Sequence, residues 1–448
     1  MKKFLFVLIL FAASLINPQT VDITIKNLNS SKAFILSLSG EKLKLIDSVI
    51  STSKEKFHFK LDNKKYRPGF YKFSFDSTKS IIFVNDGEDI SIYTNAKSTM
   101  DSLKILKSEG NKLYYSFIKL NKQYKEKTQI LNAVLASYPK NDAYYKQTQN
   151  RLNEIQNEYI EFVNISAQKN PQSFVAKYIK SAQLPVIDVS IPPSQHIFYS
   201  RSNALNNVDF KNSQLVNSDL FTNKSIEYLT YFSNQQLPKE LLEKEFMKAI
   251  DSLLNKAKVN QIVYQHITEY LIDGFKKYGF DLVIDYIVEN YVIKDDICLN
   301  IKTEGMIKKR IDQAKYFKIG NAVPNIMMND VNQKPFELNK ISTEKILVVF
   351  YASWCPHCKE LLPKLNEFKK QKNKIEIIAI SLDTKKEDWS NFVKNNCPLL
   401  INVSDLEGWD GQTVNNYFIY ATPTMFLLDK EKKLSSKPIT FEELLNKL

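Results

Sequence analysis

The stretch Phe350-Tyr351-Ala352-Ser353-Trp354-Cys355-Pro356-His357-Cys358 decides how this 448-residue chain is interpreted. It continues a near-continuous apolar run over 345–351, which is typical of a central strand buried on both faces. It leads into the stretch 358–370, which is predicted to be a helix. A Cys-x-x-Cys pair at a strand-to-helix junction indicates redox chemistry, because a helix N-terminus favours the thiolate that attacks a disulfide.

The residues of this motif have separable predicted roles. Cys355 falls just before the first helical turn, where its sulfur can face solvent and the helix N–H groups. Cys358 lies one turn further on and can attack the mixed disulfide that Cys355 forms. Pro356 has no N–H to lose in the first turn, and a charged His357 would favour the Cys355 thiolate. Cys355 and Cys358 are therefore the predicted catalytic residues.

Zinc binding and a structural disulfide are the competing interpretations of the pair. Three zinc ligands within four residues cannot close a tetrahedral site, and the other histidines have no ligand-like spacing. No metal is therefore predicted. The chain has only four cysteines, too few for a disulfide scaffold of this length. Cys397 is interpreted as a buried free thiol, and a third redox role for Cys397 or Cys298 stays open.

The chain after Phe317 alternates between strand and helix patterns. The predicted strands after the motif are 375–382 and 425–428, and the predicted helices are 385–396 and 441–448. Such alternation is typical of an α/β layered domain, here 317–448.

The region 21–98 has apolar residues at period two. Examples are Val21, Ile23 and Ile25; Phe34, Leu36 and Leu38; Phe57, Phe59 and Leu61; and Phe73 and Phe75. Turn signals separate these runs, so an N-terminal antiparallel β-sandwich is predicted. The residues 99–316 then change to helical periodicity and are predicted to form a central α-helical domain. Its expected later helices are 239–256, 260–277, 281–291 and 301–314, and Ser173 is a candidate helix cap.

The first 20 residues have the pattern of a secretory signal peptide. Lys2 and Lys3 precede an apolar run over 4–15, which is shorter than the roughly 20 residues that span a bilayer. The mature protein is therefore expected in the periplasm or cell envelope. The net charge of +13 does not indicate nucleic-acid binding, because the lysines are scattered and only four arginines are present.

The stretch from about Ile319 to the end resembles the thioredoxin-like TlpA/ResA family of exported thiol-disulfide oxidoreductases. The resemblance rests on 319–324, on the motif 350–358, on Pro363 and on Ala421-Thr422-Pro423-Thr424. It implies a thioredoxin fold in which Pro423 is cis and faces the cysteines. It also implies that Thr422 contacts the sulfurs and offers its backbone to an extended substrate. Trp354, Pro356, His357, Thr422 and Pro423 are thus the expected supporting residues.

The upstream region resembles two accessory domains that precede such thioredoxin domains in bacterial envelope proteins. The matching segments are 68–71, 82–84, 86–88 and 208–210, and they are short. The chain departs from the family at Leu361, where a glutamate is usual; Glu360 is one residue earlier, about 100° around the helix. Tyr351 also replaces the usual Trp. Both departures leave the proton-transfer partner undefined.

Together these features predict an exported oxidoreductase that reduces disulfides of envelope proteins, such as apocytochrome in cytochrome c biogenesis. Its partners would be protein thiols and disulfides and a membrane electron donor. No cofactor is expected beyond the Cys355–Cys358 disulfide, and the oligomeric state is left open. Three alternatives remain: a DsbA-like oxidase or isomerase, suggested by Pro356-His357; a partner-binding envelope protein with a vestigial Cys-x-x-Cys; and, last, a peroxidase.

Overall fold

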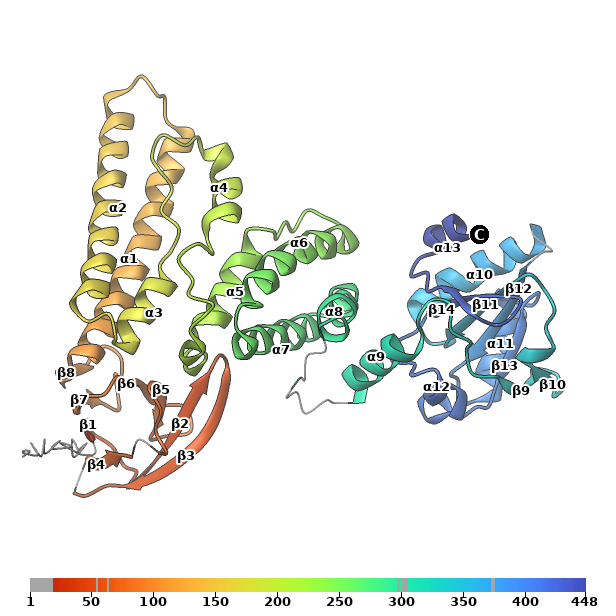
Figure 1. The fold of residues 1–448 in the computed structure, drawn as a ribbon, viewed down its shortest axis with the longest axis horizontal. Coiled ribbons are helices and arrows are strands. Elements are labelled where there is room, and N and C mark those ends of the chain that lie inside the picture. Colours follow the sequence, from red (N-terminus) through yellow and green to blue (C-terminus); the bar gives the residue numbers. More distant parts are fainter. Residues whose placement is uncertain (1–18, 54, 63, 296–298, 300–304, 372–374) are drawn as a thin grey trace, which may run out of the picture. The chain divides into compact units, whose positions relative to one another are not determined.

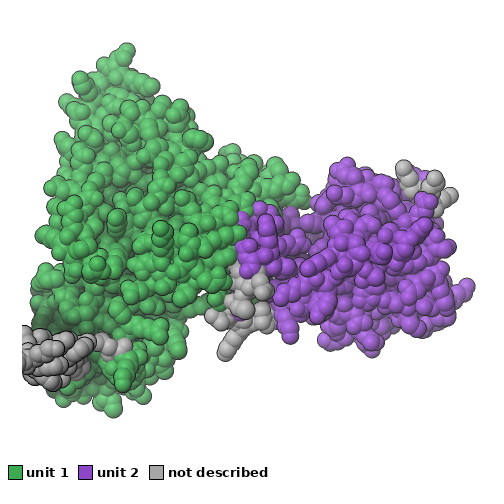
Figure 2. Space-filling model, viewed as in Figure 1, with its two compact units in different colours: residues 1–278 green, residues 279–448 purple. Residues whose placement is uncertain are grey.

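The chain forms two compact units, 1–278 and 279–448 (Figures 1 and 2). The computed structural model describes residues 19–53, 55–62, 64–295, 299, 305–371 and 375–448. The predicted signal peptide up to residue 18, and Cys298, lie outside the described residues. Among the helices of the described segments, none combines the length and the hydropathy needed to cross a bilayer.

Unit 1 begins with eight strands in two four-stranded sheets. One sheet has the order β4-β1-β7-β8 and the other β3-β2-β5-β6. The strands are β1 (Gln19–Lys26), β2 (Lys32–Ser39), β3 (Lys42–Ile50), β4 (Lys56–Leu61), β5 (Gly69–Ser74), β6 (Ser80–Asn85), β7 (Ile90–Asn95) and β8 (Lys104–Lys107). The neighbouring strands pair antiparallel as predicted, except that β1 and β7 pair parallel. β8 lies past residue 98, in the stretch expected to be helical.

The residues of β2 that face the core of the β region are not those of the period-two pattern Phe34, Leu36 and Leu38. Ala33 and Ile35 are fully buried, whereas Phe34 is 42% exposed. The pairing of β2 with β3 shifts register between Ile35 and Leu36. The extra residue of this irregularity is Ile46 of β3, so the alternation of side chains along β2 itself is not interrupted. Phe34 and the half-buried Leu36 and Leu38, which gave the period-two pattern, thus lie on the face of β2 opposite to Ala33 and Ile35.

Helices follow the sheets in unit 1, and Figure 1 shows the two longest, α1 and α2, side by side. They are α1 (Glu109–Ser137), α2 (Ala143–Lys169), α3 (Phe174–Ala182), α4 (His196–Asn203), α5 (Leu220–Thr230), α6 (Lys239–Ala257) and α7 (Gln261–Lys277), with short 3₁₀ turns η1 (Pro193–Gln195) and η2 (Ser213–Asn217). The Ser173 side chain accepts a hydrogen bond from the Ala176 N–H, which confirms Ser173 as the cap of α3.

One turn of the β region, residues 86–88, is hydrogen-bonded to the N-termini of two helices. Asp86 accepts hydrogen bonds from the Ser173 hydroxyl and from the Phe174 N–H at the start of α3. Glu88 accepts from the Ser108 hydroxyl and from the N–H groups at residues 109 and 110, at the start of α1. Carboxylates stabilise helix N-termini because the first N–H groups have no partner within the helix. The 86–88 turn therefore ties both helices to the sheets.

Unit 2 is built around a seven-stranded sheet with the order β10-β9-β13-β12-β11-β14-β15. Its strands are β9 (Met327–Asp330), β10 (Pro335–Glu337), β11 (Lys345–Tyr351), β12 (Ile375–Ser381), β13 (Ile401–Ser404), β14 (Thr424–Asp429) and β15 (Leu434–Ser436). The central strand β11 pairs parallel with β12 and antiparallel with β14. All residues of β11 after Lys345 are buried, as the apolar run predicted.

Along the chain, the helices of unit 2 lie before, between and after these strands (Figure 1). They are α8 (Asp281–Ile287), the π-helix η3 (Val288–Ile293), α9 (Gly305–Tyr316), α10 (Pro356–Gln371), α11 (Lys386–Asn396), α12 (Gln412–Asn416) and α13 (Phe441–Lys447), with 3₁₀ turns η4 (Leu338–Lys340) and η5 (Gly408–Asp410). Unit 2 thus extends further toward the N-terminus than the expected 317–448 domain, because α8, η3 and α9 group with it. The overall class is the predicted one: N-terminal β-sheets, a central helical region and a C-terminal α/β domain.

Candidate active site

The cysteine pair lies where β11 passes into α10, at the position that the sequence predicted. Cys355 immediately precedes the first residue of α10, Pro356. Its Sγ accepts a hydrogen bond from the Cys358 N–H at 3.4 Å, and its carbonyl accepts the Lys359 N–H at 3.1 Å. Sulfur thus takes the place of a capping oxygen at the helix start. This position directs helix N–H groups at the atom that would carry the thiolate charge.

The two cysteines differ less in solvent exposure than the sequence analysis predicted. Cys355 is 4% exposed, and Cys358 is fully buried; both are free thiols in the structure. The expectation of a solvent-facing Cys355 therefore does not hold, because Cys355 is part of the hydrophobic core cluster of unit 2. Burial raises the pKa of the Cys358 thiol well above its usual range, and its hydrogen bond with Cys355 acts in the same direction. Cys358 is thus held as a neutral thiol until its environment changes.

A second segment of chain reaches the cysteines from the start of β14. The Thr422–Pro423 peptide bond is cis, in agreement with the resemblance. The Cys355 thiol donates a hydrogen bond to the Thr422 carbonyl, with 3.4 Å between sulfur and oxygen. The Thr424 hydroxyl donates to the Ala421 carbonyl at 2.7 Å and so fixes the next turn of this segment. Thr422 and Cys355 are therefore brought together, although 67 residues separate them in the sequence.

The other predicted supporting residues surround the pair on its outer side. Trp354 is 55% exposed, and Pro356 and His357 are also exposed. Glu360 is exposed and Leu361 is buried, so the family's usual glutamate position faces the core here. Trp354 therefore presents apolar surface beside the cysteine pair.

Asp383 is a residue of this site that the sequence analysis missed. It follows β12 and is 2% exposed. Its carboxylate accepts hydrogen bonds from the Ser353 hydroxyl at 2.6 Å, from the Ser353 N–H at 3.1 Å and from the Ser381 hydroxyl at 2.6 Å. Asp383 therefore fixes the turn between β11 and Cys355. A polar residue directly after a buried strand, next to the predicted motif strand, was the available signal.

A buried polar network lies behind the same strand. The Trp389 Nε1–H donates to the Tyr351 hydroxyl at 3.1 Å, and the Asn402 amide donates to the Cys397 carbonyl at 2.8 Å. Cys397 is fully buried, and burial raises its pKa to about 12. This agrees with the interpretation of Cys397 as a buried free thiol.

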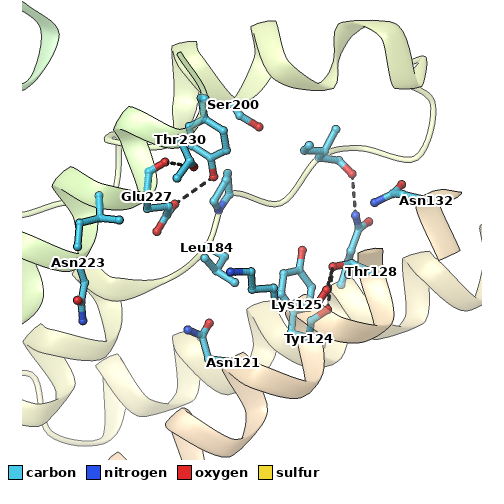
Figure 3. Close-up of a pocket in the computed structure, with 15 residues that line it drawn as sticks. Asn121, Tyr124, Lys125, Thr128, Asn132, Leu184, Ser200, Asn223, Glu227 and Thr230 are labelled. Carbon is cyan, nitrogen blue, oxygen red and sulfur yellow. Dashed lines mark hydrogen bonds between the residues drawn. The ribbon is translucent and has the colours of Figure 1, made fainter. Parts of the chain in front are cut away.

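A metal site and a ligand cavity are two further features that a functional site could contain. Across those segments, no three acidic, histidine or cysteine side chains are grouped so that they could hold an ion. A cavity of about 520 Å³ lies in unit 1 between α1, α2, the 184–187 segment, α4 and α5 (Figure 3). Tyr124, Asn121 and Glu227 contribute to its lining, which contains no cysteine among the described residues. The described cysteines all belong to unit 2, whereas this cavity lies in unit 1.

Comparisons with known proteins agree with this geometry. A family model described as thioredoxin-like matches residues 343–434, which include both cysteines and Pro423. Thiol-disulfide oxidoreductase ResA of Bacillus thuringiensis subsp. konkukian is 33% identical over 119 residues, which are 26% of this chain and 67% of the relative. ResA of Bacillus subtilis is 29% identical over 120 residues, 26% of this chain and 64% of the relative.

A solved thiol-disulfide oxidoreductase from Bacteroides fragilis is 26% identical; the alignment covers 28% of this chain and 96% of that one, with a TM-score of 0.26. The match to the thioredoxin-like family model lies in the C-terminal part of the chain, where the cysteine pair lies. The chain belongs to the thioredoxin-like thiol-disulfide oxidoreductases of the ResA family.

Proposed function

We propose that this protein is an exported reductase of disulfides in envelope proteins, and that Cys355 and Cys358 perform the exchange. The observation that carries the proposal is the position of the Cys355 sulfur. It receives the Cys358 N–H at the start of α10 and lies beside the Thr422 carbonyl. A helix N-terminus stabilises a thiolate, so the arrangement suits Cys355 as the attacking group.

The proposed reaction has two exchange steps. The Cys355 thiolate attacks one sulfur of the partner's disulfide; a mixed disulfide forms, and the partner's other sulfur leaves as a thiolate that takes up a proton. Cys358 then loses its proton and attacks the Cys355 sulfur. This forms the Cys355–Cys358 disulfide and releases the second partner thiol. The partner gains two electrons and the cysteine pair loses them.

The burial of Cys358 supports this order of attack. Its thiol is fully buried and its pKa is raised by burial, so it is a poor first nucleophile. Once Cys355 is in a mixed disulfide, Cys358 is one helical turn away from the sulfur that it must attack. A membrane dithiol donor is proposed to return the pair to the reduced state, and no cofactor is required besides the disulfide itself.

Export is proposed from the sequence pattern of the first 20 residues. An envelope location is compatible with a reductase that receives electrons through the membrane. The substrate class proposed is a protein disulfide, such as that of an apocytochrome, because Trp354 offers exposed apolar surface next to the sulfur.

The test is the reduction potential of the Cys355–Cys358 pair, equilibrated against glutathione and dithiothreitol. A value near thioredoxin's, roughly −270 mV, is expected for a reductase, and insulin reduction is then the activity assay. A value near that of DsbA, roughly −120 mV, would instead make the protein an oxidase or isomerase. Failure of the pair to form a disulfide would refute redox function and favour the partner-binding alternative. The double variant Cys355→Ser, Cys358→Ser is the control in each assay.

A further inference from the structure

The segment that carries Thr422 is held on its other side by α9, a helix that precedes the thioredoxin-like match. That match begins at residue 343, whereas α9 ends at Tyr316. Two residues of α9, Arg310 and Gln313, contact the 417–420 segment, and both are at least 96% buried. α9 therefore contacts the chain a few residues before the Thr422 carbonyl, on which the Cys355 thiol is hydrogen-bonded.

Arg310 is the centre of the first contact. Its guanidinium forms ion pairs with Asp281 and with Asp285, the latter at 2.5 Å. The Tyr420 hydroxyl donates a hydrogen bond to the same Asp285 oxygen at 2.9 Å. The guanidinium also lies over the Tyr420 ring, 4.2 Å from its centroid. An arginine suits this place because its planar group can pair two carboxylates and stack on an aromatic face at once.

The cost of disturbing this contact is high, because the groups are removed from water. Arg310 is 3% exposed, and burial raises the pKa of the Asp285 carboxyl while the Arg310 charge opposes that rise. Removing one member of a buried ion pair leaves the other charge without compensation. The Tyr420 side chain is thus fixed both through its hydroxyl and through its ring.

Gln313 forms the second contact, with the backbone itself. Its Nε2 donates to the Tyr417 carbonyl at 3.1 Å and to the Phe418 carbonyl at 3.2 Å. The ring of Tyr316, one turn further along α9, stacks on Phe418 with 5.2 Å between centroids. One amide group thereby donates to two successive backbone carbonyls. The 417–420 segment is therefore held at the backbone of Tyr417 and Phe418 and at the side chain of Tyr420.

We infer that α9 is a brace for the active site, and that Arg310 and Gln313 are positioning residues that hold the Thr422 carbonyl against the Cys355 sulfur. The inference rests on the proposed role of Cys355 as the attacking thiol. It adds that the redox domain of this chain includes α8 and α9, and that the access of a reagent or substrate to Cys355 depends on them. A domain cut at residue 317 would lack the brace.

The experiment measures the rate at which iodoacetamide alkylates Cys355 in the reduced, full-length protein, with mass spectrometry to identify the modified cysteine. The variants are Arg310→Met, Gln313→Met and Tyr420→Phe. Release of the segment should expose the sulfur, which is 4% exposed in the native chain. We expect alkylation of Cys355 to accelerate about fivefold or more in Arg310→Met and Gln313→Met. A fivefold change corresponds to the net free energy of about one hydrogen bond. Tyr420→Phe should show a smaller increase.

Two controls separate positioning from general loosening. Lys369→Met removes a comparable contact of unit 2, because Lys369 donates to the Ile375 carbonyl and pairs with Glu376 at the far end of α10. It should leave the rate at Cys355 within twofold of wild type. Cys397, which is fully buried, should stay unmodified in every protein.

The same variants should raise the KM for insulin while kcat is largely retained, because the segment would bind substrate without taking part in the exchange. Wild-type rates of Cys355 alkylation in Gln313→Met and Tyr420→Phe would overturn the brace, and so would equal acceleration at Cys397. If Arg310→Met does not fold, these two variants decide. Absence of insulin reduction by the wild-type protein would refute the proposed function alone, since alkylation requires no catalysis.

Discussion

Replacement of Asp383 by alanine should destabilise unit 2, because this buried carboxylate satisfies three donors, two of the half-buried Ser353 and one of the buried Ser381. The variant leaves the Ser353 N–H without its acceptor and removes the partners of the Ser353 and Ser381 hydroxyls. Each buried donor left unpaired costs about 1–3 kcal/mol, but the two hydroxyls can rotate toward other acceptors. We therefore expect a loss of about 3 kcal/mol in the free energy of unfolding. For a unit of 279–448, this corresponds to a fall in melting temperature of about 6–12 °C.

The assay can be confined to unit 2, because all three tryptophans of the chain, Trp354, Trp389 and Trp409, belong to it. Tryptophan fluorescence during heating thus follows this unit and not the tyrosine-rich unit 1. Ser353→Ala is the matched control: it removes only one of the three hydrogen bonds and should cost about 1 kcal/mol. If Asp383→Ala melted no lower than Ser353→Ala, the carboxylate would not be the residue that fixes the turn before Cys355.

Three further outcomes are expected. Cys358→Ser should accumulate a mixed disulfide with a protein substrate, visible on a non-reducing gel, whereas Cys355→Ser should not; equal trapping would contradict the assigned order of attack. Burial lowers the pKa of His266 to about 4, so the unfolded chain binds more protons between pH 6.5 and 4. Unit 1 should lose about 3 kcal/mol of stability as the pH falls through that range, measured by urea unfolding. His266→Leu should flatten this slope, and an unchanged slope would contradict the assignment. Gly69→Ala should destabilise unit 1 by roughly 2 kcal/mol. Gly69 has a φ of +149°, and a Cβ there would lie 2.7 Å from the Asn217 carbonyl oxygen. A variant that unfolds at the wild-type denaturant midpoint would contradict this prediction.

The parts of the site that were predictable are those with local signals. The buried strand 345–351 and the cysteine spacing lie within one stretch, and that stretch defines both the end of β11 and the start of α10. The contact of Cys355 with Thr422 required the family resemblance, because no local pattern links residues 67 positions apart. Solvent exposure of Cys355 was the wrong expectation, since burial depends on what packs over the turn.

The parts that were missed depend on long-range contacts. Asp383 and Arg310 look in the sequence like ordinary charged residues near the ends of elements. Their roles come from partners on other elements: Ser353 for Asp383, and Asp285 and Tyr420 for Arg310. The inward face of β2 was likewise not predictable from the sequence, because apolar side chains lie on both of its faces: Phe34, Leu36 and Leu38 on one, and Ala33 and Ile35 on the other.

The 86–88 turn has a consequence for how the N-terminal half of the chain can be divided. A fragment ending at residue 98 would leave the carboxylates of Asp86 and Glu88 without the helix N–H groups that they hold. It would also lose the Asn111 amide, which pairs with both the N–H and the carbonyl of Val84 on the edge strand β6. The apolar side chain of Phe70, now packed against Tyr114, Phe174 and Tyr178, would face water. The sheets and the first helices are therefore expected to fold and unfold as a single module. Recombination between related proteins should accordingly exchange them together.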